Sequence, residues 1–205
     1  MEFADKVAIS KDIILGLSAI AVVVFAWIGL QAWRRELTGK ARFKTARSMM
    51  RLGYKLKYDF EWARHPFTRA YEWADRTAQD KESGGESHVL NEWYARGNRL
   101  NSVAKSLNKM IEVQWEAEIL LDESSVQDVK EAVKSYRESY ADLASAVSSY
   151  FDVRQDEART GEQYKDQDWL RELRKTIFSP SGDDFSKKVD GATDKLSLAL
   201  KKYVK

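Results

Sequence analysis

The sequence opens with a continuous apolar stretch, and the remaining chain shows periodic amphipathic stretches. Residues 13–33 contain no charged side chain. At a rise of about 1.5 Å per residue, a helix over this stretch crosses the roughly 30 Å hydrocarbon core of a bilayer. A cleaved signal peptide is the rival interpretation, but the start is slightly acidic and the stretch exits into large and basic residues instead of a small-residue cleavage site. We therefore predict a transmembrane helix at residues 13–33.

Beyond this stretch, hydrophobic residues recur every three or four positions, which is the spacing of amphipathic helices. The clearest pattern predicts a long helix whose buried positions are Val126, Val129, Val133, Tyr136, Tyr140, Leu143, Val147 and Tyr150. A second pattern predicts a helix over residues 87–121 with a buried seam at Leu90, Trp93, Gly97, Leu100, Ala104, Leu107 and Ile111. Shorter patterns predict helices over residues 68–79 and 169–177, and a final helix capped by Asp183 or Asp184.

Breaks in the pattern place the connections between these helices. Pro66 should end the first cytoplasmic helix, because the residue before a proline avoids the helical region. Residues 80–87 have the composition of a flexible loop, and residues 154–163 are polar and look loose. Ser125, with an acidic residue three positions later, has the pattern of a capping box for the long helix that follows. The first helix is either one rod or bends near Gly39.

No stretch alternates with the period of a strand, so the predicted fold class is all-α. The predicted architecture is a single N-terminal transmembrane helix followed by a cytoplasmic antiparallel bundle of three to four long helices. The pattern over residues 126–150 serves intermolecular coiled-coil pairing equally well.

Charge on the two sides of the apolar stretch predicts its orientation. Residues 34–57 contain nine basic side chains and one acidic one, whereas residues 1–12 contain two lysines and three acids. The positive-inside rule then leaves the N-terminus outside the inner (plasma) membrane and the rest in the cytoplasm. The predicted parts are an extracytoplasmic segment 1–12, the span, a basic juxtamembrane helix 34–64 and a bundle 65–205.

Two tryptophans and the first basic residues are the candidates for contact with the membrane surface. Indole rings favour the headgroup boundary, and a cation within a Debye length of about 8 Å gains about 1 kcal/mol from anionic lipid. The alternative is that these cations only fix the topology. The candidates are Trp27, Trp33, Arg34, Arg35, Lys40, Arg42 and Lys44.

An aromatic cluster with interleaved arginines follows the first cytoplasmic helix. Aromatic and arginine side chains dominate the energetics of protein interfaces, but such a cluster also packs the end of a bundle. The region has no net positive charge, which disfavours nucleic acid. The candidate partner interface is Trp62, Phe67, Arg69, Tyr71 and Trp73.

Composition excludes several kinds of chemistry. The chain has no cysteine and only two histidines, His65 and His88, so thiol catalysis, cysteine-bound zinc and a di-iron bundle site are disfavoured. The acidic side chains at 112–123 do not converge on one helical face. There is no glycine-rich phosphate loop and no nucleophile elbow. We expect no cofactor, no metal, no small-molecule substrate and no enzymatic activity.

Short motifs give the sequence a family likeness. The block WRRELTGKARFKTAR (residues 33–47) resembles a W-R/K-R-x-L-x-G-K element beneath the membrane in a group of uncharacterised bacterial single-span membrane proteins. Residues 64–67 are similar to that group's R-x-P-F element, residues 114–120 to an acidic helical patch, and residues 183–185 to the start of its last helix. The resemblance implies a single span and a cytoplasmic helical domain.

Two classes of function fit these features. The first is a membrane-tethered helical scaffold or adaptor that binds a cytoplasmic protein partner or further copies of itself. The alternative is an oligomerising membrane-active effector or sensor, of the stress or defence type, whose bundle acts on the bilayer through the span.

Overall fold

The computed structural model describes residues 2–78, 82–178 and 181–204, with side chains from Leu15 onward except at positions 16 and 19. These residues form five α-helices and one short 3₁₀ helix and include no strand, which confirms the all-α class. The chain divides into two compact units, Met1–Lys44 and Thr45–Lys205. Helix α1 (Glu2–Ala63) contributes to both units, and its backbone is helical across Gly39.

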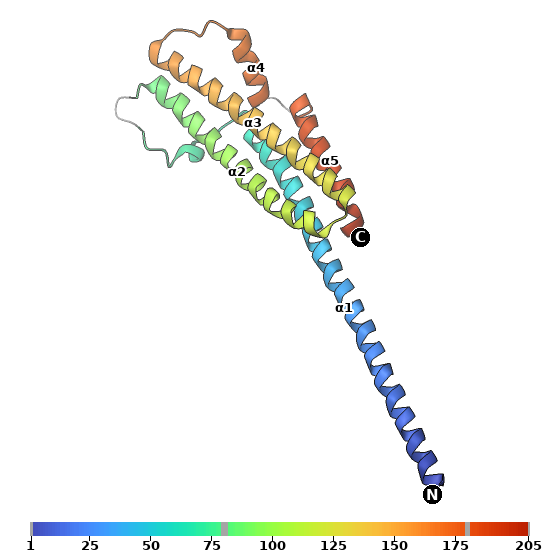
Figure 1. Ribbon diagram of the computed structural model, residues 1–205. Helices are drawn as coiled ribbons and strands as arrows, with labels where there is room; N and C mark the ends of the chain where they lie inside the picture. Colours follow the sequence, from blue (N-terminus) through green and yellow to red (C-terminus); the bar gives the residue numbers. More distant parts are fainter. Residues whose placement is uncertain (1, 79–81, 179–180, 205) are drawn as a thin grey trace. The chain divides into compact units, whose positions relative to one another are not determined.

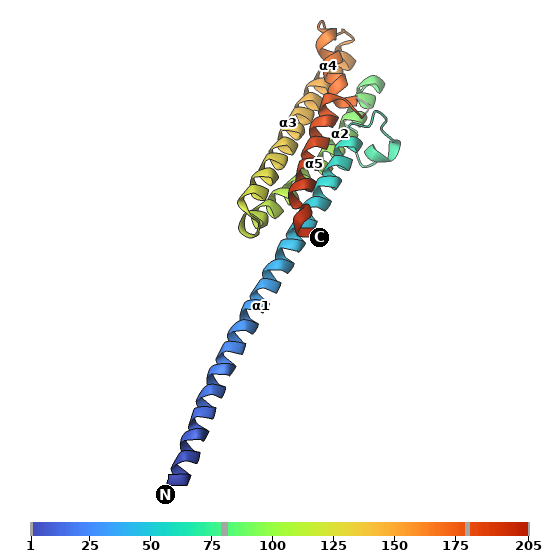
Figure 2. The same ribbon diagram turned by 90° about the vertical axis from the view of Figure 1, so that its right-hand side faces the viewer.

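The second unit is an antiparallel bundle of four helices, in agreement with the prediction (Figures 1 and 2). Its members are the end of α1, α2 (Gly84–Leu120), α3 (Glu123–Thr160) and α5 (Asp184–Val204). Salt bridges join the start of α5 to the middle of α3, from Lys188 to Asp142 (3.5 Å), and the end of α5 to the start of α3, from Lys202 to Asp122 (2.7 Å), as antiparallel packing requires. Helix α4 (Gln167–Phe178) lies in the connection between these two helices and packs against α3.

The core contains side chains from all four helices of the bundle. Phe60, Met110, Tyr136 and Leu196 are each at most 1% exposed. Gly53 on α1 lies against them: a Cβ at this position would be 2.7 Å from Leu196 Cδ2 and 3.4 Å from the Tyr136 hydroxyl. The absence of a side chain at Gly53 therefore allows α1 and α5 to approach closely.

The predicted seam of α3 is confirmed, whereas that of α2 is wrong in part. On α3 all eight predicted positions are buried or partly buried against the core. On α2, Trp93 is 48% exposed, and the buried face instead includes Arg96 and Arg99. The sequence pattern treats arginine as a surface residue, so the register of the buried face on α2 was missed.

The connection between α1 and α2 differs from the prediction in part. Helix α1 ends at Ala63, just before the His65–Pro66 pair, as predicted. The helix expected over residues 68–79 is reduced to the 3₁₀ helix η1 (Ala70–Trp73). Helix α2 begins at Gly84, inside the predicted loop, because the Ser83 side chain accepts the backbone N–H of Glu86 and caps the helix. Residue 79 of the predicted helix and residues 80 and 81 of the predicted loop lie outside the described residues.

Helix α3 is capped and terminated by residues other than those predicted. The cap is Asp122, whose carboxylate accepts the backbone N–H of Ser125 at 3.2 Å. The helix then continues through residues 154–160, which were expected to be loose, because Val153 and Ala158 pack against the core. It ends where Gly161 adopts a left-handed conformation at φ 76°. Helix α5 is capped by Asp183, one of the two predicted residues.

In the part of the chain with described side chains, no helix has the length and hydropathy that a membrane crossing needs. Positions 13, 14, 16 and 19 of the predicted transmembrane helix lie outside that part, as do the side chains of residues 1–12. The transmembrane helix stays a prediction.

Candidate functional site

The segment that follows α1 is held by two buried arginines of α2. The first, Arg96, is 1% exposed, and its Nη1 donates to the carbonyls of Ala63 at 3.0 Å and His65 at 2.6 Å. Its Nη2 donates to the Pro66 carbonyl at 2.8 Å. Burial, and then the neighbouring charge of Arg99, lower the pKa of Arg96 to about 10. The guanidinium therefore stays charged at neutral pH and pairs carbonyls that helix α1 leaves free at its end.

The second arginine, Arg99, binds the same segment from the last turn of α1 to Glu72. Its Nη1 donates to the Trp62 carbonyl at 3.2 Å, and its Nη2 to the Phe67 carbonyl at 2.7 Å. Nε and Nη2 bind both carboxylate oxygens of Glu72, at 2.6 and 2.8 Å. Burial alone would raise the pKa of Glu72, but hydrogen bonds from Arg99 and from the Arg69 backbone N–H lower it below its usual value. Both members of this ion pair are charged and nearly buried, with side chains 2% and 7% exposed.

A third arginine joins the end of α1 to the start of α5. The Arg64 guanidinium binds the Asp183 carboxylate and donates to Ser186 Oγ at 3.0 Å and to the Thr176 carbonyl at 2.8 Å. It also lies over the Phe185 ring, 4.3 Å from the centroid. The hydrogen bond from Arg64 is the main cause that holds the pKa of Asp183 well below its usual range. Because Asp183 caps α5, this contact ties the helix start to the α1 terminus.

The residues of the predicted partner interface fall into two groups, one exposed and one partly buried. Phe67 and Tyr71 are 74% and 63% exposed, and Arg69 is exposed between them. Trp62 and Trp73 are partly buried, and the Arg99 guanidinium covers the Trp62 ring at 4.4 Å. The structure thus presents Phe67, Arg69 and Tyr71 on one short segment, while the two tryptophans contribute largely to packing.

In the first unit, the described part of α1 exposes an apolar surface on every side. Val22, Val23, Val24 and Phe25 are 67%, 68%, 48% and 73% exposed. Four consecutive helical positions point in four directions about 100° apart, so no face of this stretch is polar. The other exposed apolar side chains of the stretch are Leu15, Leu17, Ile20, Trp27, Ile28 and Leu30.

The predicted membrane-surface residues follow directly along the same helix. Trp27 and Trp33 are 63% and 57% exposed. The predicted cations Arg34, Arg35, Lys40, Arg42 and Lys44 are all exposed. Glu36 pairs with Lys40 at 2.6 Å, and the hydrogen bond from Lys40 lowers the pKa of this carboxylate. An exposed apolar surface is therefore followed along the helix by an exposed cationic one.

The sequence analysis missed the buried arginines of α2 and an exposed apolar pair on the same helix. Arg96 and Arg99 lie three apart, in helical register with the buried Val103, and that spacing was the available signal. Trp115 and Ile119 are 61% and 83% exposed on α2, four positions apart and beyond the predicted seam. The same spacing that predicts a buried seam here produces an exposed apolar ridge.

Three acidic side chains at residues 112–123 make structural contacts. Glu118 pairs with Lys130 at 3.2 Å, Glu116 accepts from the Thr45 hydroxyl at 3.4 Å, and Asp122 caps α3. Across residues 2–78, 82–178 and 181–204, as far as side chains are described, no group of histidine or acidic side chains is placed to hold a metal ion. The chain matches no protein-family model, no curated protein and no solved structure.

Proposed function

We propose that this chain is a non-enzymatic, single-pass membrane protein whose cytoplasmic helical bundle binds a protein partner, or a second copy of itself, at the inner face of the plasma membrane. The observation that carries this proposal is the surface of α1 between residues 15 and 30, which is apolar and exposed on every side. The exposed cations at 34–44 support an orientation with the bundle in the cytoplasm. The W-R-R-x-L-x-G-K block after the span fits the same topology.

The energetics of the exposed surface favour a bilayer. Ten large apolar side chains between residues 15 and 30 are at least 40% exposed. Burying one such side chain is worth about 1.5–3 kcal/mol, so the group represents roughly 15–30 kcal/mol. That exceeds the stability of a typical domain, about 5–15 kcal/mol. A hydrocarbon environment removes this surface from water without any partner protein.

The partner surface we propose is the segment with Phe67, Arg69 and Tyr71. Phe67 and Tyr71 leave most of their side chains exposed, although hydrogen bonds to Arg99 and Glu72 fix the backbone between them. A fixed backbone lowers the entropy lost when the aromatic side chains dock, which favours binding. Attachment to the membrane then raises the local concentration of the bound partner.

Single-cysteine labelling tests the topology, because the chain contains no cysteine of its own. We expect a membrane-impermeant maleimide to label Ala4→Cys in intact spheroplasts and Lys187→Cys only after lysis. The Val23→Arg/Phe25→Arg variant should lose membrane retention during alkaline carbonate extraction. Labelling of Lys187→Cys in intact spheroplasts, or release of the unmodified chain by carbonate, contradicts the proposed topology.

Site-specific photo-crosslinking tests the partner surface. A photoreactive phenylalanine analogue at Tyr71 should capture a second protein in cells, and Phe67→Ser should abolish the product. Leu198→Ser is the matched control, since Leu198 is as exposed as Phe67 (74% each) but lies on α5. A product between two copies of the chain makes the complex a homo-oligomer. Loss with Leu198→Ser but not with Phe67→Ser rejects this surface.

The membrane-active alternative makes the opposite prediction about the span. If the bundle acts on the bilayer, replacing residues 13–33 with an unrelated transmembrane helix should abolish function, and overexpression of the original chain should depolarise cells. If the chain is an adaptor, the replacement should preserve the crosslink at Tyr71 and cause no depolarisation.

A further inference from the structure

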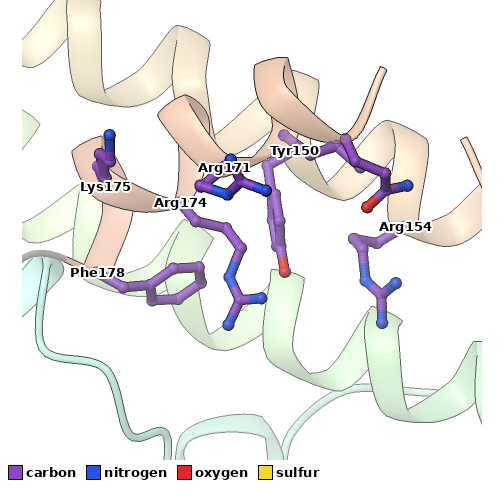
Figure 3. A pocket seen from close by; sticks show the side chains of 8 residues that line it. Tyr150, Arg154, Arg171, Arg174, Lys175 and Phe178 are labelled. Carbon is purple, nitrogen blue, oxygen red and sulfur yellow. The ribbon is translucent and has the colours of Figure 1, made fainter. Parts of the chain in front are cut away.

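An open pocket lies between the end of α3 and helix α4 (Figure 3). Its volume is about 640 Å³, within the roughly 300–1,000 Å³ typical of sites for small molecules. Four of its eight lining residues are basic and none is acidic. The lining consists of Tyr150, Arg154, Gln167, Leu170, Arg171, Arg174, Lys175 and Phe178.

The base of the pocket is apolar and aromatic. Leu170 and Tyr150 are 5% and 9% exposed. The Tyr150 and Phe178 rings meet edge to face at 5.6 Å, and Phe178 keeps part of its surface open. Burial raises the pKa of Tyr150, although Arg174 and Arg154 act in the opposite direction. The Tyr150 hydroxyl therefore stays protonated at neutral pH and can donate a hydrogen bond.

The arginines surround this hydroxyl. In Figure 3 the side chains of Arg174 and Arg154 extend toward the same side as the Tyr150 hydroxyl, whereas Lys175 points away. The electrostatic influence of Arg174 and Arg154 on Tyr150 agrees with this placement. Guanidinium groups offer paired N–H donors in a planar fork that matches phosphate oxygens. Two guanidinium groups and one hydroxyl thus offer hydrogen-bond donors on the same side of the pocket.

Among the described residues, three of the four cations of the pocket already pair with an acidic side chain, and Arg174 does not. Arg171 pairs with Asp168 at 2.7 Å and Lys175 with Glu172 at 2.6 Å, each three positions apart on exposed α4. These two exposed pairs contribute only about 0.3–0.5 kcal/mol each, so a ligand displaces them at little cost. Arg154 pairs on α3 with Glu157, whose side chain is only 12% exposed. Arg174 makes no ion pair or hydrogen bond with any other described residue, and its charge faces the pocket.

From these observations we infer that the pocket between α3 and α4 binds a phosphate-bearing ligand, with Arg174, Arg154 and the Tyr150 hydroxyl on the phosphate and the Phe178 ring against the rest of the molecule. The ligand is either a free nucleotide-like phosphate or the headgroup of an anionic phospholipid, which share this chemistry. Occupation links α3 to α4 and gives the bundle a ligand-dependent state. From the sequence we expect no small-molecule substrate. The proposed site binds a ligand and catalyses no reaction on it. It does not depend on the membrane span or on the surface around Phe67.

Hydrogen exchange on the full chain in nanodiscs tests the site and separates the two sources. In phosphatidylcholine discs, ATP or pyrophosphate should slow amide exchange in α4 and at the end of α3 in a saturable way. Protection that requires phosphatidylglycerol in the discs, and no soluble phosphate, identifies a lipid headgroup. Either result supports the site, and both should weaken at high salt. No protection by any of these three probes overturns the inference.

Matched variants tie the protection to the proposed residues. Arg174→Ala should weaken binding about tenfold or more, the loss expected for a charge-assisted hydrogen bond. Arg174→Lys should fall between Arg174→Ala and the unmodified chain, because it keeps the charge without the fork. Arg159→Ala is the control, since Arg159 lies on α3 in an exposed pair with Asp156, outside the pocket. An equal loss in Arg159→Ala means general charge attraction and overturns the site.

Discussion

The ion pair between Arg99 and Glu72 allows a quantitative test of how the aromatic segment is held. In Arg99→Met the buried side chain keeps its apolar length but loses the guanidinium. The carbonyls of Trp62 and Phe67 then lose a donor, and the nearly buried Glu72 carboxylate loses the guanidinium that binds both its oxygens. Removing one member of a buried ion pair costs about 3–5 kcal/mol, chiefly because the other charge stays buried. We expect Arg99→Met to destabilise the bundle by that amount.

The companion variants separate the charge from the packing. Glu72→Gln keeps an acceptor for Arg99 and should cost about 1–3 kcal/mol. In Arg99→Met/Glu72→Gln no uncompensated charge stays buried, so the double variant should lose clearly less than the sum of the single variants. Arg159→Ala is the control for an exposed ion pair, with side chains 67% and 62% exposed, and should change stability little.

Urea unfolding of the full chain in mild detergent measures these differences. Tryptophan fluorescence follows unfolding as a sum over the seven tryptophans of the chain, one of which, Trp62, has its ring 4.4 Å from the Arg99 guanidinium. Amide exchange of residues 64–73 should rise in Arg99→Met before the bundle unfolds. If Arg99→Met lowers the free energy of unfolding by less than about 1 kcal/mol, the role assigned to this ion pair is refuted. A buried carboxylate left without its partner should cost more than that. Additive single variants would refute the coupling.

Three further predictions concern the bundle. Gly97→Ala should stabilise the bundle by up to about 1 kcal/mol through helix propensity, because a Cβ there meets nothing within 4 Å. Gly53→Ala should show no such gain, because its Cβ would lie 2.7 Å from Leu196 Cδ2. The midpoints of urea unfolding compare the two variants. Tyr136→Phe should cost about 0.5–1.5 kcal/mol by removing a buried 2.7 Å hydrogen bond, measured by thermal unfolding. Asp183 has a lowered pKa in the folded chain, so its contribution to stability is present above the usual value of about 3.9 and is lost as the pH falls toward the folded pKa. In acid titrations, Asp183→Asn should therefore lose less stability than the original chain between about pH 5 and pH 2, and an unchanged acid profile would contradict the contact with Arg64.

Local sequence signals were sufficient for the class of fold and for much of one helix. The alternation of threes and fours over residues 126–150 predicted the buried face of α3, because each helix needs one apolar stripe to pack. Pro66 located the end of α1 for a local reason, the steric restriction on the preceding residue. Helix starts were less certain, since Asp122 and Ser125 are equally good caps in sequence and only the packing of α3 selects between them.

The candidate partner surface was predicted in composition but not in arrangement. Sequence reasoning identified Phe67 and Tyr71 as aromatic candidates together with Trp62, and it had no means to separate them. The separation depends on Arg99, which covers the Trp62 ring and leaves Phe67 exposed. Arg99 lies in another helix, far along the chain, so no local pattern at residues 62–73 contains this information.

The sequence by itself determined the helical class, the apolar stretch at residues 13–33 with its basic flank, and the main helical periodicities. These properties depend on hydrophobicity, charge and residue spacing within a single segment. Only the tertiary structure decided that Arg64, Arg96 and Arg99 are buried, since their acceptors lie on other elements. It also decided the close approach at Gly53 and the basic pocket between α3 and α4. An arginine enters a core only where packing brings enough oxygen acceptors together, and that condition is met by the folded chain as a whole.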